Sequence, residues 1–550
     1  MRAPRSSAFA MAAAAIAVPL AAGCGGDPAK PGSPDGGRRT GGTSGAPAPA
    51  SPKASWIPAF VAGMSPAEKV GQLFVPTFAG QGAAQSMIKR YKVGGLIYFP
   101  GNMRTPAQTA AQSNALQRSS KVPLLLGVDE EQGIVSRTPF ITSFPGNMAL
   151  GATRRPEDAR AAARVTGTEL RAVGINQNYA PVADVNVNPA NPVIGVRSFG
   201  SDPALVSRML QAAIEGYQAA GVAATAKHFP GHGDTDTDSH TGLPVINHSR
   251  AEWERLDAPP FKAAIASDVD AIMSAHIVVP KLDGSGDPST LSRKVLTGLL
   301  RDTLGFKGVI VTDSLQMEGA RKKYGDSATP VRAINAGADQ LLMPPSLPRA
   351  YDAVLKAVQS GKISKQRLDD AVSRILRLKE QRGLFRGTRV DPARASRIIG
   401  SKDNRATVRQ VAEHAVTLVR NEGVLPLKQG RVYVSGPRSD VLAAALRREG
   451  VRTVGSAGAA DATVLTTLNA GASTTATRVR TLTSQPVIVA ALGRPYDLDK
   501  AGGAKAALAT YSSGTPALTA LAKALAGKIK PTGKLPVPAA GKPPGTGLTY

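Results

Sequence analysis

The chain is poor in the residues that cross-link a fold or read nucleic acid. It has 550 residues but a single cysteine, Cys24, so it can form no internal disulfide. Aromatic residues make up only 4% of it, its basic residues are dispersed, and no nucleic-acid-binding motif occurs, which argues against a nucleic-acid partner. The formal net charge of +27 instead favours anionic surroundings, such as phospholipid headgroups or acidic wall polymers.

Long apolar runs are lacking except near the N-terminus, where Ala8–Leu20 follows Arg2 and Arg5 and leads to Cys24. The run is short for a membrane span and is typical of a signal peptide. The ending Ala21-Ala22-Gly23-Cys24 resembles the lipobox of bacterial lipoproteins, although Ala21 stands where leucine is usual. We therefore expect a lipoprotein signal peptide at 1–24, acylation of Cys24, and an exported protein anchored to the extracytoplasmic face of the cell membrane. A plain secretory signal, giving a secreted protein, is the alternative.

The composition predicts three further segments. Residues 25–55 are rich in Gly, Pro, Ala and Ser and predict a disordered tether. Residues 56–390 alternate short apolar runs with longer amphipathic stretches, and the composition changes again over 400–550. A chain of this length is too long for one ordinary core, so we expect a large catalytic domain followed by a smaller one.

Eight apolar runs in the first of these domains predict parallel strands, because near-continuous Val, Ile, Leu and Ala suits strands buried on both faces. Amphipathic stretches between them, such as 156–173, 203–220, 251–267 and 291–304, are long enough for crossover helices. The pattern favours a (β/α)₈ TIM-type barrel. The predicted strands are 72–77, 95–99, 123–129, 175–184, 222–228, 271–276, 308–313 and 340–343.

The second domain shows the same alternation on a smaller scale. Candidate strands at 431–435, 462–467 and 486–491 are separated by Ala-rich helical stretches, which predicts an α/β sandwich. No acidic or histidine cluster occurs in it, so packing or substrate docking is expected there rather than chemistry.

Polar residues fall at the carboxyl ends of the predicted barrel strands, where the active sites of such barrels lie. They are Asp129, Asp184, Lys227, His228, His276 and Asp313. Any one of them could be an ordinary turn or capping residue. Several strands that end in charge beside one pocket predict a functional site.

The densest polar segment is 227–240, which reads KHFPGHGDTDTDSH. Calcium binding by an EF-hand-like loop is excluded, because Ser239 and Val245 stand where that loop needs glycine and glutamate. Zinc is disfavoured, because no helical pair of histidines with a downstream ligand occurs. Acid/base catalysis is favoured: in an extended segment residues i and i+2 share a face, so Asp238 can orient His240 and stabilise its protonated ring.

Asp313 ends the predicted strand 308–313. A carboxylate in this place could attack the anomeric carbon of a sugar and form a covalent intermediate. It could equally cap the helix that follows. The spacing alone does not separate the two roles.

The segment 227–240, together with VTDSLQM over 311–317, resembles the β-N-acetylglucosaminidase (NagZ-like) branch of glycoside hydrolase family 3. The likeness runs over 67–385 through 94–97, 180–184, 193–199, 273–276 and 336–339, and continues in the second domain at 492–498 and 531–537. It implies that Asp313 is the nucleophile and that His240 with Asp238 forms the acid/base dyad. His232 and Asp234 would then shape the loop.

The resemblance also implies a set of sugar-binding residues: Asp129, Arg137, Arg197, Lys227 and His228. The chain departs from the family in the loop after the third strand, where DEEQGIV over 129–135 replaces the usual D-x-E-G-G-R-V. Gln132 thus replaces a glycine and Ile134 an arginine. Both changes bear on the shape of that loop.

These residues lead us to expect a retaining exo-β-N-acetylhexosaminidase that acts on peptidoglycan fragments or chito-oligosaccharides and needs no cofactor and no metal. Phosphorolysis of the same bond, β-glucosidase activity, and a non-catalytic wall-glycan-binding lipoprotein are the alternatives. Oligomeric state and aglycone preference are not predicted.

Overall fold

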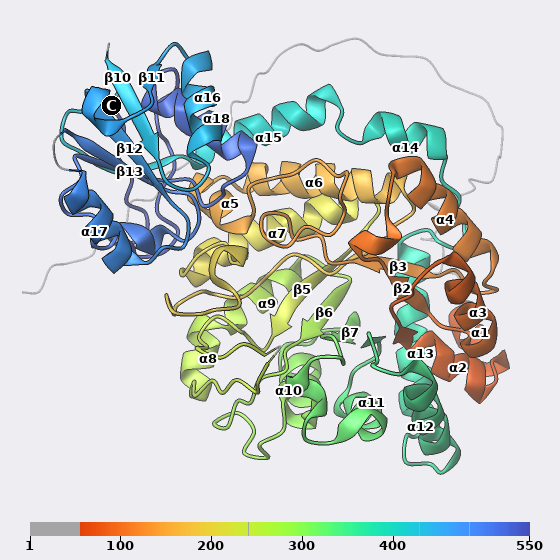
Figure 1. Ribbon diagram of the computed structural model, residues 1–550. Coiled ribbons are helices and arrows are strands. Elements are labelled where there is room, and N and C mark those ends of the chain that lie inside the picture. The colour runs from red at the N-terminus through yellow and green to blue at the C-terminus, as the bar shows by residue number, and fades with distance from the viewer. Residues whose placement is uncertain (1–54, 240, 428–429, 483–484) are drawn as a thin grey trace, which may run out of the picture. The chain divides into compact units, whose positions relative to one another are not determined.

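A computed structural model describes residues 55–239, 241–427, 430–482 and 485–550 (Figure 1). Cys24 and the rest of 1–54, and also His240, lie outside the described residues. Among the residues described, no helix is both long enough and apolar enough to cross a membrane.

The first domain is built on parallel strands whose residues are all buried. Six of those described form one sheet in the order β2-β3-β4-β5-β6-β7, and β1 pairs with β8. Each of the eight predicted runs overlaps one of these strands; seven strands are shorter than their runs, and β5 is shifted by one residue from the predicted 222–228. They are β1 (Phe74–Val75), β2 (Gly95–Ile97), β3 (Leu125–Val128), β4 (Gln177–Asn178), β5 (Ala223–Phe229), β6 (Ala271–Ser274), β7 (Val309–Thr312) and β8 (Leu341–Leu342).

Backbone hydrogen bonds join the two sheets into a closed ring. Phe74 pairs with Leu341 in the β1–β8 ladder. The Ile97 N–H donates to the Pro76 oxygen at 3.2 Å on one side, and the Thr312 N–H donates to the Gln340 oxygen at 3.0 Å on the other. The ring leaves no open sheet edge, and the predicted (β/α)₈ barrel is confirmed.

Helices surround the strands (Figure 1). Their apolar faces pack on the strands to form the largest core cluster. The helices and short turns of this domain are α1 (Ile57–Gly63), α2 (Pro66–Gln72), α3 (Gln81–Tyr91), η1 (Pro100–Asn102), α4 (Pro106–Arg118), α5 (Asn147–Thr153), α6 (Pro156–Ala172), η2 (Gly195–Arg197), α7 (Pro203–Ala219), α8 (Arg250–Leu256), α9 (Ala258–Ala266), η3 (Ser289–Leu291), η4 (Lys294–Thr303), α10 (Glu318–Arg321), α11 (Gly325–Ala336), α12 (Leu347–Gln359) and α13 (Lys365–Gln381).

One predicted helix is divided. The stretch 251–267 forms α8 and α9, which meet at Asp257. Pro259 and Pro260 cause the division, because proline fits the first turn of a helix and disrupts its interior. The stretch 291–304 also differs from a regular α-helix, since η4 is a π-helix.

Helix α13 crosses the end of the barrel at which the strands begin. Its Leu378 and the following Leu384 pack against the first residues of β3, β5, β6 and β7. Lys379 Nζ donates to Gln72 Oε1 at 2.7 Å, just before β1. We call this side the closed end. It lies opposite the carboxyl ends of the strands.

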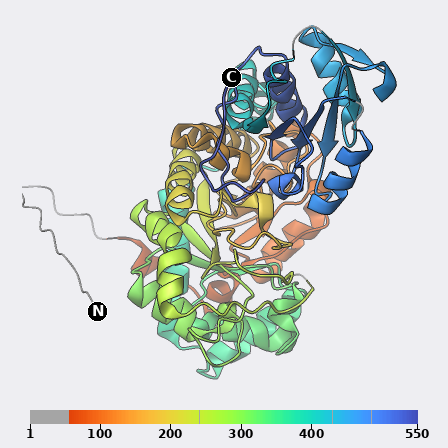
Figure 2. The ribbon, with the colours of Figure 1, turned by 90° about the vertical axis from the view of Figure 1, so that its left-hand side faces the viewer.

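The second domain contains a six-stranded sheet in the order β11-β10-β12-β13-β14-β9 within its described residues (Figure 2). The strands are parallel except β9, which runs antiparallel to β14. The predicted α/β architecture is confirmed. The elements are α14 (Pro392–Ile398), α15 (Lys402–Ala415), β9 (Thr417–Asn421), β10 (Arg431–Ser435), α16 (Ser439–Arg448), β11 (Arg452–Val454), η5 (Ala457–Ala459), β12 (Ala462–Thr467), α17 (Ala472–Thr481), β13 (Val487–Ala491), η6 (Pro495–Leu498), β14 (Ala506–Ala509) and α18 (Thr515–Leu525).

An apolar cluster is shared by the two domains. Met148 and Ala152 of α5 are buried with Val419, Val489 and Leu535 of the second domain. The Lys534 N–H donates to the Ala152 oxygen at 2.8 Å. The Ser201 N–H, in the connection after β4, donates to the Pro536 oxygen at 3.0 Å, so the loops after β3 and β4 are both supported by the second domain.

Candidate active site

A cavity of about 400 Å³ lies at the carboxyl ends of the barrel strands. Six of the sequence-predicted site residues line it together: Asp129, Arg137, Arg197, Lys227, His228 and Asp313. Lys227 and His228 belong to β5, and the other four belong to the connections that follow β3, β4 and β7. Of the two predicted dyad residues, Asp238 does not line the cavity, and His240 lies outside the described residues.

Asp313 follows β7 directly and is partly exposed to the cavity. The Ser314 N–H donates to its Oδ1 at 2.6 Å. Burial among protein atoms opposes ionisation, but the nearby His228 and His276 rings and this N–H hold the pKa of the carboxyl below its usual value. Asp313 is not the cap of the next helix, because α10 begins at Glu318 with Met317 at its N-cap. It is an ionised carboxylate facing the cavity.

Glu131 organises the cations of the site. It accepts two hydrogen bonds from Arg197, Nε to Oε2 and Nη2 to Oε1, both at 2.8 Å. Its Oε1 also lies 2.7 Å from Lys227 Nζ, which donates to Asp129 Oδ1 at 2.8 Å. Burial favours the neutral forms, yet the opposite charges lower the pKa of Glu131 and raise the pKa values of Arg197 and Lys227. All three stay charged.

His228 is oriented from behind by Asp184. Its Nδ1 lies 2.7 Å from Asp184 Oδ2, while Oδ1 accepts the N–H groups of His228 at 3.1 Å and His232 at 2.8 Å. The register of β5 against β6 shifts between Lys227 and Phe229. This irregularity lets two consecutive side chains, Lys227 and His228, both reach the cavity, although strand residues normally alternate between faces.

The loop after β5 is tied down by other residues of the KHFPGHGDTDTDSH segment. His232 Nε2 lies 3.1 Å from Ser239 Oγ, and burial lowers the pKa of the His232 ring to about 4. His248 lies between two carboxylates, with Nδ1 2.7 Å from Asp257 Oδ2 and Nε2 3.0 Å from Asp234 Oδ2. The hydrogen bond to Asp257, with the contact to Asp234, raises the pKa of His248 to about 9. His232 and Asp234 thus make contacts that hold the loop, the role that the family resemblance implies for them.

Asp238 lies in a turn of this loop, where its backbone oxygen accepts the Thr241 and Gly242 N–H groups at 3.1 and 2.9 Å. The expected pairing of Asp238 with His240 stays a prediction. In the described residues no cluster of three or more His, Cys, Asp or Glu side chains is arranged to hold a metal ion.

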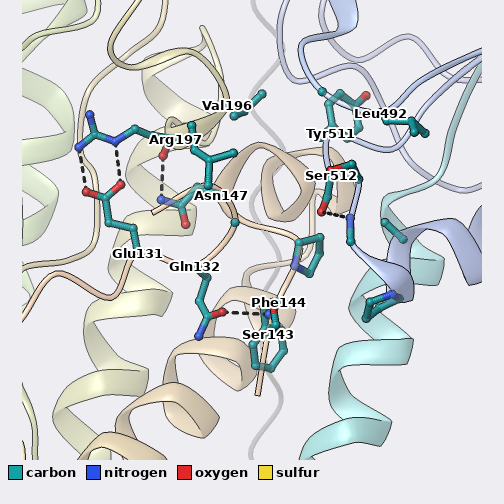
Figure 3. Close-up of a pocket in the computed structure, with 18 of the residues that line it drawn as sticks. Glu131, Gln132, Ser143, Phe144, Asn147, Val196, Arg197, Leu492, Tyr511 and Ser512 are labelled. Carbon is teal, nitrogen blue, oxygen red and sulfur yellow. Dashed lines mark hydrogen bonds and ion pairs between the residues drawn. The ribbon is translucent and has the colours of Figure 1, made fainter. Parts of the chain in front are cut away.

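A second cavity, of about 210 Å³, lies between the barrel loops and the second domain (Figure 3). Glu131 and Arg197 line both cavities. Asn147 Nδ2 donates to the Arg197 oxygen at 2.8 Å and so supports the loop that carries this arginine. On the other side, Figure 3 shows Leu492, Tyr511 and Ser512 of the second domain.

Sequence reasoning did not identify the supporting role of two residues, Glu131 and Asp184. The sequence marks Asp184 as a polar residue at a strand end, but it does not show that Asp184 pairs with His228. Glu131 is two residues after Asp129 and could have been recognised as a second carboxylate of that loop. Both contact the sugar-binding candidates from behind, through Arg197 and Lys227 or through His228.

Comparisons with protein families and with known proteins identify relatives of this chain. Residues 66–378 match the glycosyl hydrolase family 3 N terminal domain, and residues 441–543 match the C-terminal domain of that family. The chain is 38% identical over 378 residues to beta-hexosaminidase A of Pseudoalteromonas piscicida, a match that spans 63% of this chain and 63% of that protein. It is 37% identical to a beta-N-acetylglucosaminidase/beta-glucosidase of Cellulomonas fimi, over 68% of each chain.

The fold is similar to a solved structure of a glycoside hydrolase family 3 beta-N-acetylglucosaminidase from Paenibacillus sp. str. FPU-7. The TM-score is 0.81 and the sequence identity 38%, over 87% of this chain and 100% of the other. The family match covers more than half of the chain and includes every barrel strand. The chain belongs to glycosyl hydrolase family 3.

Proposed function

We propose that the protein is a retaining exo-β-N-acetylhexosaminidase that removes terminal β-linked N-acetylglucosamine from peptidoglycan fragments or chito-oligosaccharides. The observation that carries this proposal is the ionised carboxylate of Asp313 at the wall of a cavity ringed by Asp129, Arg137, Arg197, Lys227 and His228. Relatives named beta-hexosaminidase support the choice of an N-acetylhexosamine as substrate.

In the first step Asp313 attacks the anomeric carbon and forms a glycosyl ester, while the bond to the leaving oxygen breaks. His240, oriented by Asp238, gives its proton to that oxygen. In the second step His240 takes a proton from water, and the oxygen of that water displaces the Asp313 carboxylate. Two inversions at one carbon retain the β configuration.

The charged ring around Asp313 would hold the terminal sugar. Asp129 can accept hydrogen bonds from adjacent hydroxyls, and Arg197, Lys227 and His228 can donate them. Arg137 lines the cavity, and its Nε has no hydrogen-bond partner among the described residues. This Nε is buried, so a sugar in the cavity would meet other atoms of the Arg137 side chain.

The test uses an aryl N-acetyl-β-glucosaminide, with the configuration of the first-formed sugar followed by NMR. Release of the β-anomer supports retention, and the α-anomer would overturn it. Asp313→Asn keeps the shape and removes the nucleophile, so turnover should fall by at least about 10⁴-fold. Asp302→Asn, on the exposed surface of η4, is the matched control and should keep full activity.

Two further measurements test the acid/base and the acceptor. His240→Ala should slow substrates with poor leaving groups more than those with good ones, and equal losses would exclude His240 as the acid. Added phosphate should produce no sugar 1-phosphate; if that product dominates, the enzyme is a phosphorylase. Binding of wall glycan by wild-type protein without any turnover would instead indicate a non-catalytic lipoprotein.

We further propose that the signal segment 1–24 directs export and that Cys24 is acylated. The lone cysteine at the end of a signal-like segment, after Ala21-Ala22-Gly23, supports this. Metabolic labelling with a fatty acid should mark the wild-type protein, and Cys24→Ser should abolish the label. Equal labelling of both would exclude Cys24 as the acylation site.

A further inference from the structure

Helix α1 presents an apolar face that no described residue covers. Its sequence, IPAFVAG, has no polar side chain, and only Ile57 and Val61 are buried. The remaining residues of the helix are exposed: Pro58, Ala59, Phe60, Ala62 and Gly63. A helix on the surface of a soluble domain normally turns a polar face outward.

Three aromatic side chains at this helix form what we call the aromatic patch: Trp56, Phe60 and Phe385. The centroid of the Trp56 ring lies 5.3 Å from that of Phe60 and 4.8 Å from that of Phe385. The three are 37%, 40% and 38% exposed. Only seven large apolar side chains are exposed among the described residues, and three of them gather here.

The aromatic patch lies at the closed end of the barrel, opposite the active-site cavity. Helix α1 packs on α13, and Trp56 Nε1 donates to Glu380 Oε1 near the end of that helix. Leu384, next to Phe385, packs on the first residues of β3, β5, β6 and β7. Asp313 and the cavity lie at the other ends of the strands.

The closed end is also rich in exposed cations. Lys307 and Arg377 line a crevice of about 310 Å³ beside the starts of β6 and β7, and Arg386 follows Phe385. Four exposed carboxylates lie near these elements, namely Asp268, Asp302, Asp370 and Glu380. Further exposed cations come from the ends of α3 and α4 and the loop before β3: Lys89, Arg90, Lys92, Arg118 and Lys121.

We propose that the closed end docks on a bilayer that contains anionic phospholipid, with the aromatic patch at the level of the headgroups. Aromatic side chains favour this interface, and the surrounding cations are attracted to anionic headgroups. Residues 1–54 are joined to the described part of the chain at Ser55, next to Trp56, so the covalent link to any anchor on that segment begins at this face. Docking would turn the active-site cavity away from the bilayer.

The proposal can be tested on the chain from residue 25 onward, which lacks the apolar signal segment and Cys24. Residues 55–550 form a compact unit by themselves, so this protein should fold. The chain has two tryptophans, and Trp253 is buried with its Nε1 bonded to the Pro230 oxygen, so a change of emission reports on Trp56.

We expect flotation with vesicles of equimolar phosphatidylglycerol and phosphatidylcholine and a blue shift of tryptophan emission on binding. Binding should be weak to vesicles of phosphatidylcholine alone and should fall at 0.5 M NaCl, because salt screens the attraction. Phe60→Ala combined with Phe385→Ala should weaken the binding by roughly tenfold or more. Leu548→Ala, at a site 43% exposed in the second domain, should leave it unchanged. None of these variants should alter hydrolysis of the aryl substrate.

Three results would overturn the proposal. One is equal vesicle binding by the Phe60/Phe385 double variant and the wild type. Another is a dimer in sedimentation that the double variant dissociates, which would make a second copy of the chain the partner of the patch. The third is a change in acrylamide quenching of Trp56 in the absence of vesicles. If quenching rises when residues 25–54 are removed, the chain's own N-terminal segment is the partner that covers the patch.

Discussion

Glu131 and Arg197 form a two-point ion pair, with two hydrogen bonds of 2.8 Å and side chains only 2% and 11% exposed. Lys227 joins it through Glu131 Oε1. One buried carboxylate thus fixes two cations of the cavity. The active-site cavity and the cavity beside the second domain are both lined by this pair.

Glu131→Gln should therefore damage both stability and activity. Glutamine keeps the shape but leaves Arg197 and Lys227 without one of their negative partners in a buried site. We expect the free energy of unfolding to fall by about 3 kcal/mol and kcat/KM by at least about 100-fold. Urea unfolding and steady-state kinetics measure these. Glu215→Gln, which breaks the half-exposed pair with Arg160, should change stability by less than about 0.5 kcal/mol. Equal effects of the two substitutions would contradict the role given to Glu131.

Asp184→Asn should act through His228. The substitution replaces a charged acceptor by a neutral one. It should weaken the contact with His228 Nδ1 and the hydrogen bonds from the His228 and His232 N–H groups. Hydrogen bonds to a charged group contribute about 1.5–3 kcal/mol, so kcat/KM should fall by roughly 10- to 100-fold. A double-mutant cycle with His228→Gln should show strong non-additivity. Additive losses would mean that Asp184 does not act through this ring.

His248 should make the protein less stable as the pH rises. Its pKa in the folded protein is about 9, against a usual 6.5, because Asp257 and Asp234 stabilise the protonated ring. A raised folded pKa gives a contribution that is complete below pH 6.5 and is lost as the pH rises through about 9. The melting temperature should therefore decrease more between pH 6.5 and 9.5 for wild type than for His248→Gln. Parallel curves would contradict this assignment.

Lys379 should affect the pH dependence of stability in the opposite direction. Burial in α13 lowers its pKa to about 7 from a usual 10.5, so the unfolded chain binds more protons between these values and stability rises with pH there. Lys379→Met should raise the melting temperature at pH 7 and flatten its pH dependence over that window. Lys307→Met, an exposed cation of the same end, is the control and should do neither. A lower melting temperature for Lys379→Met would show that the bond to Gln72 outweighs the burial cost.

The barrel was predictable because its strands are buried on both faces and read as apolar runs. The candidate site was predictable because Asp129, Lys227, His228 and Asp313 stand at the carboxyl ends of such runs. Strand β14 was missed because its sequence, AALA, is equally suited to a helix, and β11 because it is short and partly exposed. The supporting contacts of Glu131 and Asp184 were not predictable, since they join residues far apart in sequence.

The course of α13 was equally hidden. Its amphipathic pattern is the same as that of a helix on the outside of the barrel, yet it crosses the closed end. Only the contacts of Lys379 with Gln72 and of Leu384 with the strand starts reveal this. A hydrophobic period shows which face of a helix is buried, but not which surface it is buried against.

Closure of the ring through β1 and β8 has a consequence for the timing of activity. Those strands are the first and the last of the barrel, so Phe74 can meet Leu341 only after the whole intervening segment has been synthesised and released. Such distant pairing is slow, because a long loop must be closed before the contact forms. A nascent or truncated chain would therefore contain Asp129 but would not yet have Asp313 in the same cavity. Hydrolytic turnover is accordingly a readout of a completed barrel.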